Sequence, residues 1–179
     1  SGAGHFLKAL ELENINAKGY EANKSLVNLG NKNLKKNKII NCSLDKTYNV
    51  ILNSKNHNVV ALIAVLEHLN EPNKFLKYFM KSNAKYLYIS VPLLSLSAFV
   101  ENAFNKIFPR HLSGPHTHLY TKKSISYLSS KYNLKIIGEW WFGTDMADLY
   151  RSVLISANYK NKKNYLEKLD KNFYKILDQ

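Results

Sequence analysis

The sequence has very little cysteine and contains no long apolar run. Its single cysteine, Cys42, excludes an internal disulfide and any zinc site built from several cysteines. The apolar neighbours Ile39 and Ile40 predict a buried, unreactive thiol. The longest nearly apolar run, residues 59–66, is much shorter than the roughly 18 residues of a membrane span, and the N-terminus lacks the pattern of a signal peptide. We therefore expect a cytoplasmic protein with no membrane partner.

Arginine is also scarce, although the chain carries a formal net charge of +13. Arg110 and Arg151 are its only arginines, and the other basic residues are lysines spread through every segment. Nucleic-acid sites rely on arginine for bidentate and stacking contacts, whereas scattered lysines are typical of a solvated surface. The charge therefore does not lead us to expect nucleic acid as a partner.

The length of 179 residues fits one domain, and no repeat or linker divides it. Helical spacing covers residues 5–12, 25–34, 70–80 and 122–131. Strand-like segments cover residues 15–21, 38–42, 58–65, 86–91 and 134–140. The apolar composition of 58–65 predicts a strand covered on both faces. This alternation predicts an α/β fold, a parallel sheet with helices on both faces that binds ligands at the carboxyl ends of its strands.

Two further segments have distinctive patterns. Residues 93–121 form a connection too long to be idle, and their Pro-Arg-His and Gly-Pro-His-Thr-His clusters predict a substrate-binding lid or insertion. Residues 162–178 place their apolar side chains on one face of a helix. This amphipathic helix packs most simply on the domain, and a homodimer contact is the alternative.

A glycine turn and an acidic residue point to a nucleotide-like ligand. Gly2 and Gly4 stand directly before a helical segment, where glycine lets the backbone approach a ligand and free helix amides can bind it. Leu7 stands where a dinucleotide fingerprint has its third glycine, and no P-loop motif occurs. Glu21 ends the next strand-like segment, where a carboxylate can accept hydrogen bonds from ribose hydroxyls. The pair predicts a nucleoside ligand, and a flexible tail beside a surface glutamate is the alternative.

Several motifs occur together in a characteristic order. The glycine turn is followed by Gly-Tyr-Glu at 19–21, Val-Leu-Glu-His at 65–68 before Pro72, Ser-Val-Pro at 90–92 and His-Leu-Tyr-Thr at 118–121. In this order and spacing, the chain resembles the class I S-adenosylmethionine-dependent methyltransferases, in the branch with a V-L-E-H-x-x-x-P signature. The resemblance covers most of the chain and implies a Rossmann-like methyltransferase sheet, S-adenosylmethionine as cofactor and a small-molecule acceptor.

The resemblance also implies where the cofactor lies. It assigns the glycine turn to the methionine part, Glu21 to the ribose, the end of the following strand to the adenine, and the end of the strand before Val-Leu-Glu-His to the sulfonium. The cofactor-binding residues implied in this way are Gly2, Gly4, Glu21, Ala22, Ser43, Leu44, Ala64 and Val65. In the family a first strand with an acidic residue and another glycine precedes the turn, so we expect that this chain lacks the first strand.

Histidine is the side chain best suited to accept a proton from a hydroxyl acceptor near neutral pH. The candidates are His68, His111, His116 and His118. We expect His118 as the catalytic base because it belongs to the His-Leu-Tyr-Thr motif. His111 is second, because the adjacent Arg110 could bind an acceptor phosphate. A structural role in holding the lid is the alternative, since a neutral nitrogen acceptor needs no base.

The Glu67-His68 pair is also compared with a metal motif. Some quinone and small-RNA methyltransferases hold magnesium with E-x-x-E-H and a distant histidine, but here Ala64 stands at the first glutamate. Losing one of two carboxylates weakens a site for a hard cation. We therefore expect no metal and a structural Glu67-His68 pair at a helix start. We also expect Trp140 and Trp141 to lie in the core, and a place in the lining of the acceptor pocket is the alternative.

The resemblance leads to an expected activity. The branch is frequent among enzymes that modify sugars of surface polysaccharides, so we expect methyl transfer from S-adenosylmethionine to a sugar hydroxyl. The alternatives are a quinone or RNA O-methyltransferase and a non-catalytic, methyltransferase-like interaction module.

Overall fold

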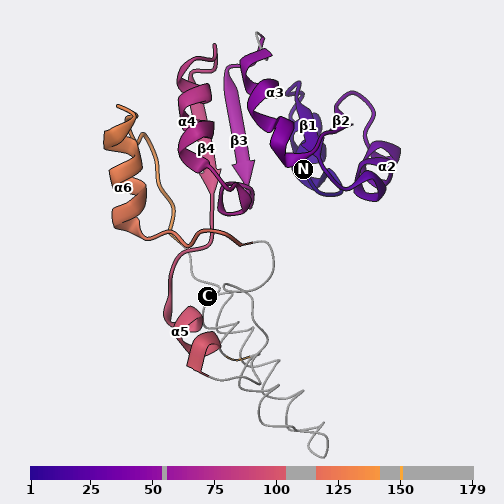
Figure 1. Ribbon diagram of the computed structural model, residues 1–179. Helices are drawn as coiled ribbons and strands as arrows, with labels where there is room; N and C mark the ends of the chain where they lie inside the picture. The colour runs from indigo at the N-terminus through magenta and orange to yellow at the C-terminus, as the bar shows by residue number, and fades with distance from the viewer. Residues whose placement is uncertain (54–55, 104–115, 142–149, 151–179) are drawn as a thin grey trace, which may run out of the picture.

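Strands and helices alternate along the chain, as the sequence predicts (Figure 1). The computed structural model describes residues 1–53, 56–103, 116–141 and 150. The elements are α1 (His5–Leu12), β1 (Lys18–Glu21), α2 (Lys24–Asn33), β2 (Lys38–Asn41), η1 (Leu44–Lys46), α3 (Thr47–Asn53), β3 (Val59–Ile63), η2 (Leu66–His68), α4 (Pro72–Met80), β4 (Tyr86–Ser90), α5 (Leu96–Ala103) and α6 (Lys122–Lys131). None of the helices described is long and apolar enough to cross a bilayer.

Local capping explains where the helices begin. The Asn23 side chain accepts hydrogen bonds from the first backbone N–H groups of α2. Thr121 and Ser124 form a capping box at the start of α6, and Pro72 occupies the first turn of α4. These residues satisfy or remove backbone donors that a helix start leaves unpaired, so α6 begins at the predicted residue and α4 begins two residues after the start of the predicted segment.

The strands pair in parallel, but the described residues form two sheets of two strands instead of one continuous sheet. β1 pairs with β2, with Lys18 opposite Lys38, and β3 pairs with β4, with Val59 opposite Tyr86. Each pair joins consecutive strands through a helix, the βαβ connection that parallel pairing requires. The alternation of strands and helices in the sequence predicts this connection, but it does not predict which strands pair with each other. The prediction of one continuous sheet was therefore wrong for the described residues.

The larger core covers one face of the β3–β4 sheet. Its strand residues are Val60, Leu62, Leu87 and Ile89, and α3, α4 and α6 pack over them. The buried members of this core are Ile51, Leu62, Leu66, Leu69, Phe75, Leu76, Phe79 and Tyr120. Because Phe75 and Leu66 are completely buried, α4 and η2 are fixed firmly against the end of β3.

The opposite face of the β3–β4 sheet is exposed. Val59 is 54% exposed and Tyr88 is 54% exposed, and Ile63 and Tyr86 lie on the same face. The expectation that this strand is covered on both faces was therefore wrong. β-Branched and aromatic residues favour strands whether or not a second layer covers them, so the apolar run predicted the strand but not its burial.

A smaller core joins α1 and α2 to the β1–β2 sheet. Leu7, Val27 and Ile39 form its buried centre. Gly30 of α2 lies so close to Ile39 that an added Cβ would collide with it. The absence of a side chain at Gly30 therefore allows helix and strand to pack closely.

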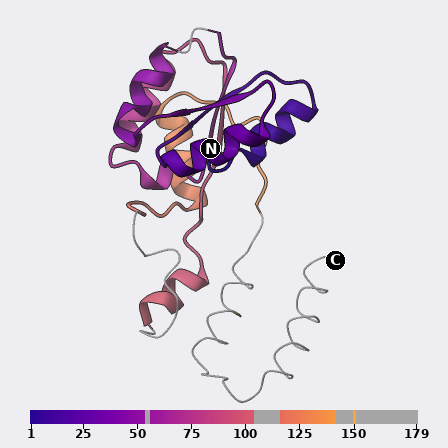
Figure 2. The ribbon, with the colours of Figure 1, turned by 90° about the vertical axis from the view of Figure 1, so that its right-hand side faces the viewer.

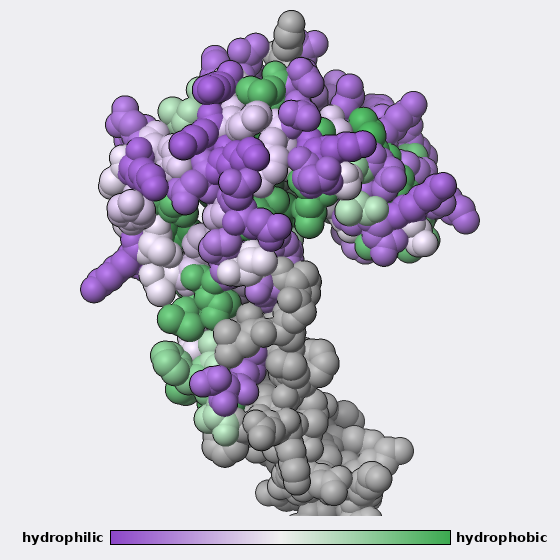
Figure 3. Space-filling view, in the orientation of Figure 1, coloured by the Kyte–Doolittle hydropathy of each residue, from purple (hydrophilic) through white to green (hydrophobic). Residues whose placement is uncertain are grey.

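Helix α5 lies apart from these layers, below them in the side view of Figure 2. Figure 3 shows apolar side chains gathered over α5, where Leu96 and Phe99 are exposed.

Residues 134–140 differ from their prediction. They are not a strand, because they pair with no other described segment. Trp140 is 83% exposed and Trp141 is also exposed, so the expected core position of this pair was wrong. The Lys122 ammonium lies 5.0 Å from the centroid of the Trp141 ring, a cation–π contact at the surface.

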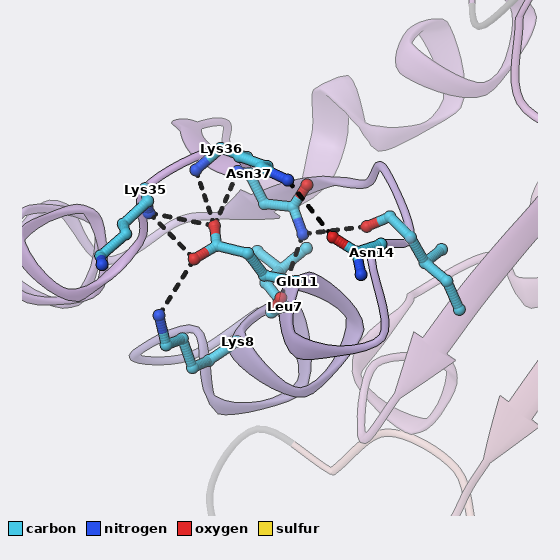
Figure 4. Close-up of polar contacts among 8 residues, drawn as sticks. Leu7, Lys8, Glu11, Asn14, Lys35, Lys36 and Asn37 are labelled. Carbon is cyan, nitrogen blue, oxygen red and sulfur yellow. Dashed lines mark hydrogen bonds and ion pairs between the residues drawn. The ribbon is translucent and has the colours of Figure 1, made fainter.

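One carboxylate ties α1 to the segment before β2 (Figure 4). Oε2 of Glu11 accepts hydrogen bonds from the backbone N–H groups of Lys36 at 2.7 Å and Asn37 at 3.0 Å. The Lys35 backbone N–H and the Lys8 ammonium donate to Oε1 at 3.1 and 3.0 Å. Since these donors, the Lys36 N–H above all, favour the ionised form, they lower the pKa of Glu11 to about 2.

We predict that Glu11→Gln lowers the free energy of unfolding at pH 7, because an amide NH2 group replaces an oxygen that accepts backbone hydrogen bonds. The ordinary carboxyl pKa is 4.5 and that of folded Glu11 is about 2. The stabilisation is therefore complete above pH 4.5 and is lost as the pH falls toward 2. Urea unfolding at pH 7 and at pH 3 will show a difference between wild type and variant that shrinks at the lower pH. The matched control is Glu13→Gln, at an exposed position, which should leave stability unchanged at both values.

Candidate functional site

Polar residues gather at the carboxyl ends of the strands in two places. The first group, the Glu21 cluster, consists of Ser1, Gly2, Glu21, Asn23 and Asn41 where β1 and β2 end. The second, the histidine cluster, consists of Glu67, His68, His116 and His118 beyond the end of β3. Ligands of parallel α/β sheets bind at this edge, so both groups are candidate sites.

In the Glu21 cluster the glycine turn contacts the acidic strand end. Oε2 of Glu21 accepts hydrogen bonds from the Gly2 backbone N–H at 2.7 Å and from the Ser1 nitrogen at 3.1 Å. Oε1 accepts one from the Asn23 backbone N–H at 3.0 Å. Partial burial raises the pKa of Glu21, but the hydrogen bonds from Asn23 and Gly2 outweigh it, so the pKa lies below its ordinary value. Glu21 is therefore an ionised acceptor at neutral pH.

The two glycines of the turn have different surroundings. Both have left-handed backbones, with φ of 53° at Gly2 and 83° at Gly4. Gly4 is buried at the start of α1, and an added Cβ would lie 3.0 Å from Cδ1 of Ile39. Nothing lies within 4 Å of a Cβ added at Gly2. Gly4 therefore seats α1 on the β1–β2 sheet, whereas Gly2 leaves open space beside the Glu21 carboxylate.

The end of β2 is tied to the same place. The Asn41 side-chain amide donates to the carbonyl oxygens of Glu21 and Ala22, both at 3.0 Å. Ser43 and Leu44, expected beside the adenine, follow after Cys42 and are exposed.

Cys42 is half-buried, whereas the sequence predicts a buried thiol, because it lines an open hollow. Its partial burial still raises the pKa of the thiol. That hollow, of about 410 Å³, is lined by Tyr20, Ile40, Asn41, Cys42, Lys46, Asn49, Val50 and Asn53.

Ala64 and Val65, expected near the sulfonium, turn the chain from β3 into η2. Ala64 has a left-handed backbone with φ of 50°, and its N–H donates to the Ser90 carbonyl at 2.9 Å. A residue with a Cβ adopts this conformation only when its surroundings enforce it. Val65 packs against the larger core. No hydrogen bond between described residues joins these two positions to the Glu21 cluster.

In the histidine cluster, residues 116–120 dock onto η2. The backbone N–H groups of Thr117 and His118 donate to the Glu67 carbonyl at 2.9 and 3.2 Å, and the Thr117 hydroxyl lies 2.9 Å from the same oxygen. The rings of His68 and His116 lie 4.7 Å apart. The docking therefore brings together side chains that are about fifty positions apart in the sequence. His111, the second expected base, lies outside the described residues, as do residues 162–178.

The orientation of His118 is fixed by Thr117. Its Nδ1 lies 2.8 Å from the Thr117 hydroxyl oxygen. That hydroxyl has one hydrogen, which it can donate to the Glu67 carbonyl at 2.9 Å or the Leu69 carbonyl at 3.2 Å. When the hydroxyl donates to one of these carbonyls, its oxygen accepts from Nδ1–H, and Nε2 of His118 keeps its lone pair. This is the tautomer that a general base at Nε2 requires.

His118 also lines a hollow of about 380 Å³ at the start of α4. The other lining residues are Asn70, Glu71, Pro72, Asn73, Lys74 and Lys77. The lining carries two amides, an imidazole, the Lys77 ammonium and the ion pair of Lys74 with Glu71 at 3.1 Å, so it suits a ligand that is rich in hydroxyl groups.

Comparison with known proteins supports the fold. No protein-family model matches the chain, and no curated protein matches it significantly. Among solved structures it is similar to a SAM-dependent methyltransferase from Archaeoglobus fulgidus, with a TM-score of 0.56, 13% identity, and coverage of 89% of this chain and 76% of that one. It is also similar to YcgJ from Bacillus subtilis, with a TM-score of 0.56, 13% identity, and coverage of 85% and 68%. The chain therefore has a fold like that of these proteins.

We predict that Gly4→Ala destabilises the protein more than Gly2→Ala. A left-handed alanine costs about 1–2 kcal/mol at either position. At Gly4 the new methyl group also pushes on Ile39, whereas at Gly2 it enters open space. Urea unfolding of the two variants measures the difference. An equal or larger loss in Gly2→Ala would contradict the packing described for the start of α1.

Proposed function

We propose that the protein is an S-adenosylmethionine-dependent methyltransferase that acts on a small acceptor. The observation that carries the proposal is the 2.7 Å hydrogen bond from the Gly2 N–H to Glu21, which puts the glycine turn and the acidic strand end at one place. A nucleoside ligand needs this combination of close backbone approach and a ribose-binding carboxylate. The methyltransferase-like fold supports the same assignment.

The residues around the Glu21 cluster fit such a cofactor. Gly2 borders open space, and Glu21 is an ionised acceptor whose oxygens can each accept more than one hydrogen bond, so they can also accept from ribose hydroxyls. The resemblance assigns the rest of the site to Gly4, Ala22, Ser43, Leu44, Ala64 and Val65. When bound, S-adenosylmethionine supplies a methyl group activated by its sulfonium.

His118 is the proposed base for an oxygen acceptor. Thr117 holds Nδ1, so Nε2 is left to take the hydroxyl proton. The hollow that His118 lines is polar and carries Lys77 beside the ion pair of Lys74 with Glu71, which suits a hydroxyl-rich sugar better than an apolar quinone. We therefore propose a sugar as the acceptor, as in the synthesis of surface polysaccharides.

Removing the Glu21 carboxylate tests the cofactor site. We predict that Glu21→Ala weakens S-adenosylmethionine binding by about 1–3 kcal/mol, the value of charge-assisted hydrogen bonds. Isothermal titration calorimetry of wild type and variant measures this, with Glu13→Ala as the matched control because Glu13 is exposed on the far end of α1. Unchanged affinity in Glu21→Ala would remove this residue from the site.

Removing the imidazole of His118 tests the catalytic step. We predict that His118→Ala lowers the rate of methyl transfer by about 10²–10⁴-fold and leaves S-adenosylmethionine affinity unchanged, because a base acts on the acceptor and not on the cofactor. The assay measures S-adenosylhomocysteine formation with a panel of nucleotide-linked sugars. His5→Ala, which removes an exposed imidazole from α1, is the control. Full activity of His118→Ala would show that His118 is not the base and has only a structural role.

A further inference from the structure

Three potential metal ligands meet beyond the end of β3. The carboxylate of Glu67 and the ring nitrogens of His68 and His116 offer one ligand atom each, and these atoms all lie within 4.8 Å of one another. Ligand atoms about 2.0–2.2 Å from one ion in tetrahedral geometry lie about 3.3–3.6 Å from one another, which is closer than this upper limit. Small side-chain rotations are therefore enough to close the three groups around a single cation.

The Glu67 carboxylate gives an independent reason to expect a cation. Glu67 is only 1% exposed, and its Oε2 is buried without a hydrogen-bond partner among the described residues. Burying an unpaired carboxylate oxygen is strongly unfavourable unless a cation or a donor compensates it. The interior at this point is thus suited to a positive ion.

We propose that Glu67, His68 and His116 form a binding site for a divalent transition-metal ion of the Zn²⁺ class. Two imidazoles and one carboxylate are the ligands that such ions prefer, whereas Mg²⁺ prefers oxygen ligands alone. The absence of a carboxylate at Ala64 argues against magnesium but not against this ion, because the third ligand is the imidazole of His116. The site does not depend on the proposed methyltransferase activity.

The surrounding contacts hold the three ligands in place. Glu67 and His68 belong to η2, which the fully buried Leu66 anchors in the larger core. His116 directly precedes Thr117, whose N–H and hydroxyl bond the Glu67 carbonyl. The ligands are therefore fixed by backbone contacts that do not use the ligating side chains. Such preorganisation lowers the cost of ordering the ligands when the ion binds.

The test is a titration of Zn²⁺ into the chain without a polyhistidine tag at pH 7.5, followed by calorimetry and by thermal unfolding. We expect one ion per chain, micromolar or tighter affinity, and a higher Tm with Zn²⁺. Glu67→Gln keeps the shape of the side chain but loses its charge, and His116→Ala removes one ligand. Each should weaken Zn²⁺ binding at least tenfold. His5→Ala, the matched control, should bind within twofold of wild type because His5 is exposed on α1.

Three results would overturn the proposal. The first is no Zn²⁺ binding by wild type, and the second is wild-type affinity in both Glu67→Gln and His116→Ala. The third is tighter binding of Mg²⁺ than of Zn²⁺, which would contradict the ligand argument. S-adenosylmethionine titrations of the same variants separate this site from the cofactor site, because the loss of zinc binding should leave cofactor affinity unchanged. Circular dichroism of each variant is the control that tests whether the fold is retained.

Discussion

The backbone carbonyl of Glu67 is the acceptor on which the histidine cluster depends. It receives the N–H groups of Thr117 and His118 and lies within reach of the Thr117 hydroxyl. Because these contacts join segments about fifty positions apart, forming them costs loop-closure entropy. The packing around them must offset this cost. The buried Tyr120 and Leu66 supply that packing, because both belong to the larger core. Without this junction, neither His116 nor His118 would lie near the end of β3.

The same junction explains why a polar cluster can sit on an apolar core. Leu66 and Leu69 flank Glu67 and His68 and point into the larger core, so η2 is anchored on both sides of the polar pair. The short 3₁₀ turn leaves its backbone carbonyls available to another segment, since it is too short to satisfy them internally. A longer helix at this place would have used the Glu67 carbonyl itself, and residues 116–120 would have had no backbone acceptor there.

The sequence predicted local features well and long-range ones poorly. The bounds of α1 and α6, and the end of α4 at Met80, follow from apolar periodicity and capping residues, which act within a few positions. The pattern also placed Gly2 and Glu21 at one ligand, because a glycine turn before a helix and the acidic end of the next strand are expected at the same edge of a parallel sheet. The exposure of Val59 and the meeting of Glu67 with His116 were not, because they depend on which segments pack together in space.

The two clusters are held by different kinds of contact. The Glu21 cluster draws on residues 1–44 alone, where Glu11 and the buried Asn37 also tie α1 to the segment before β2. The histidine cluster depends on the long-range junction between η2 and residues 116–120. For the proposed methyltransferase this division has a consequence: the segment that shapes the hollow lined by His118 can change without disturbing the contacts around Glu21. The proposed enzyme can therefore keep its cofactor site while its acceptor site varies, because no hydrogen bond between described residues joins the two clusters.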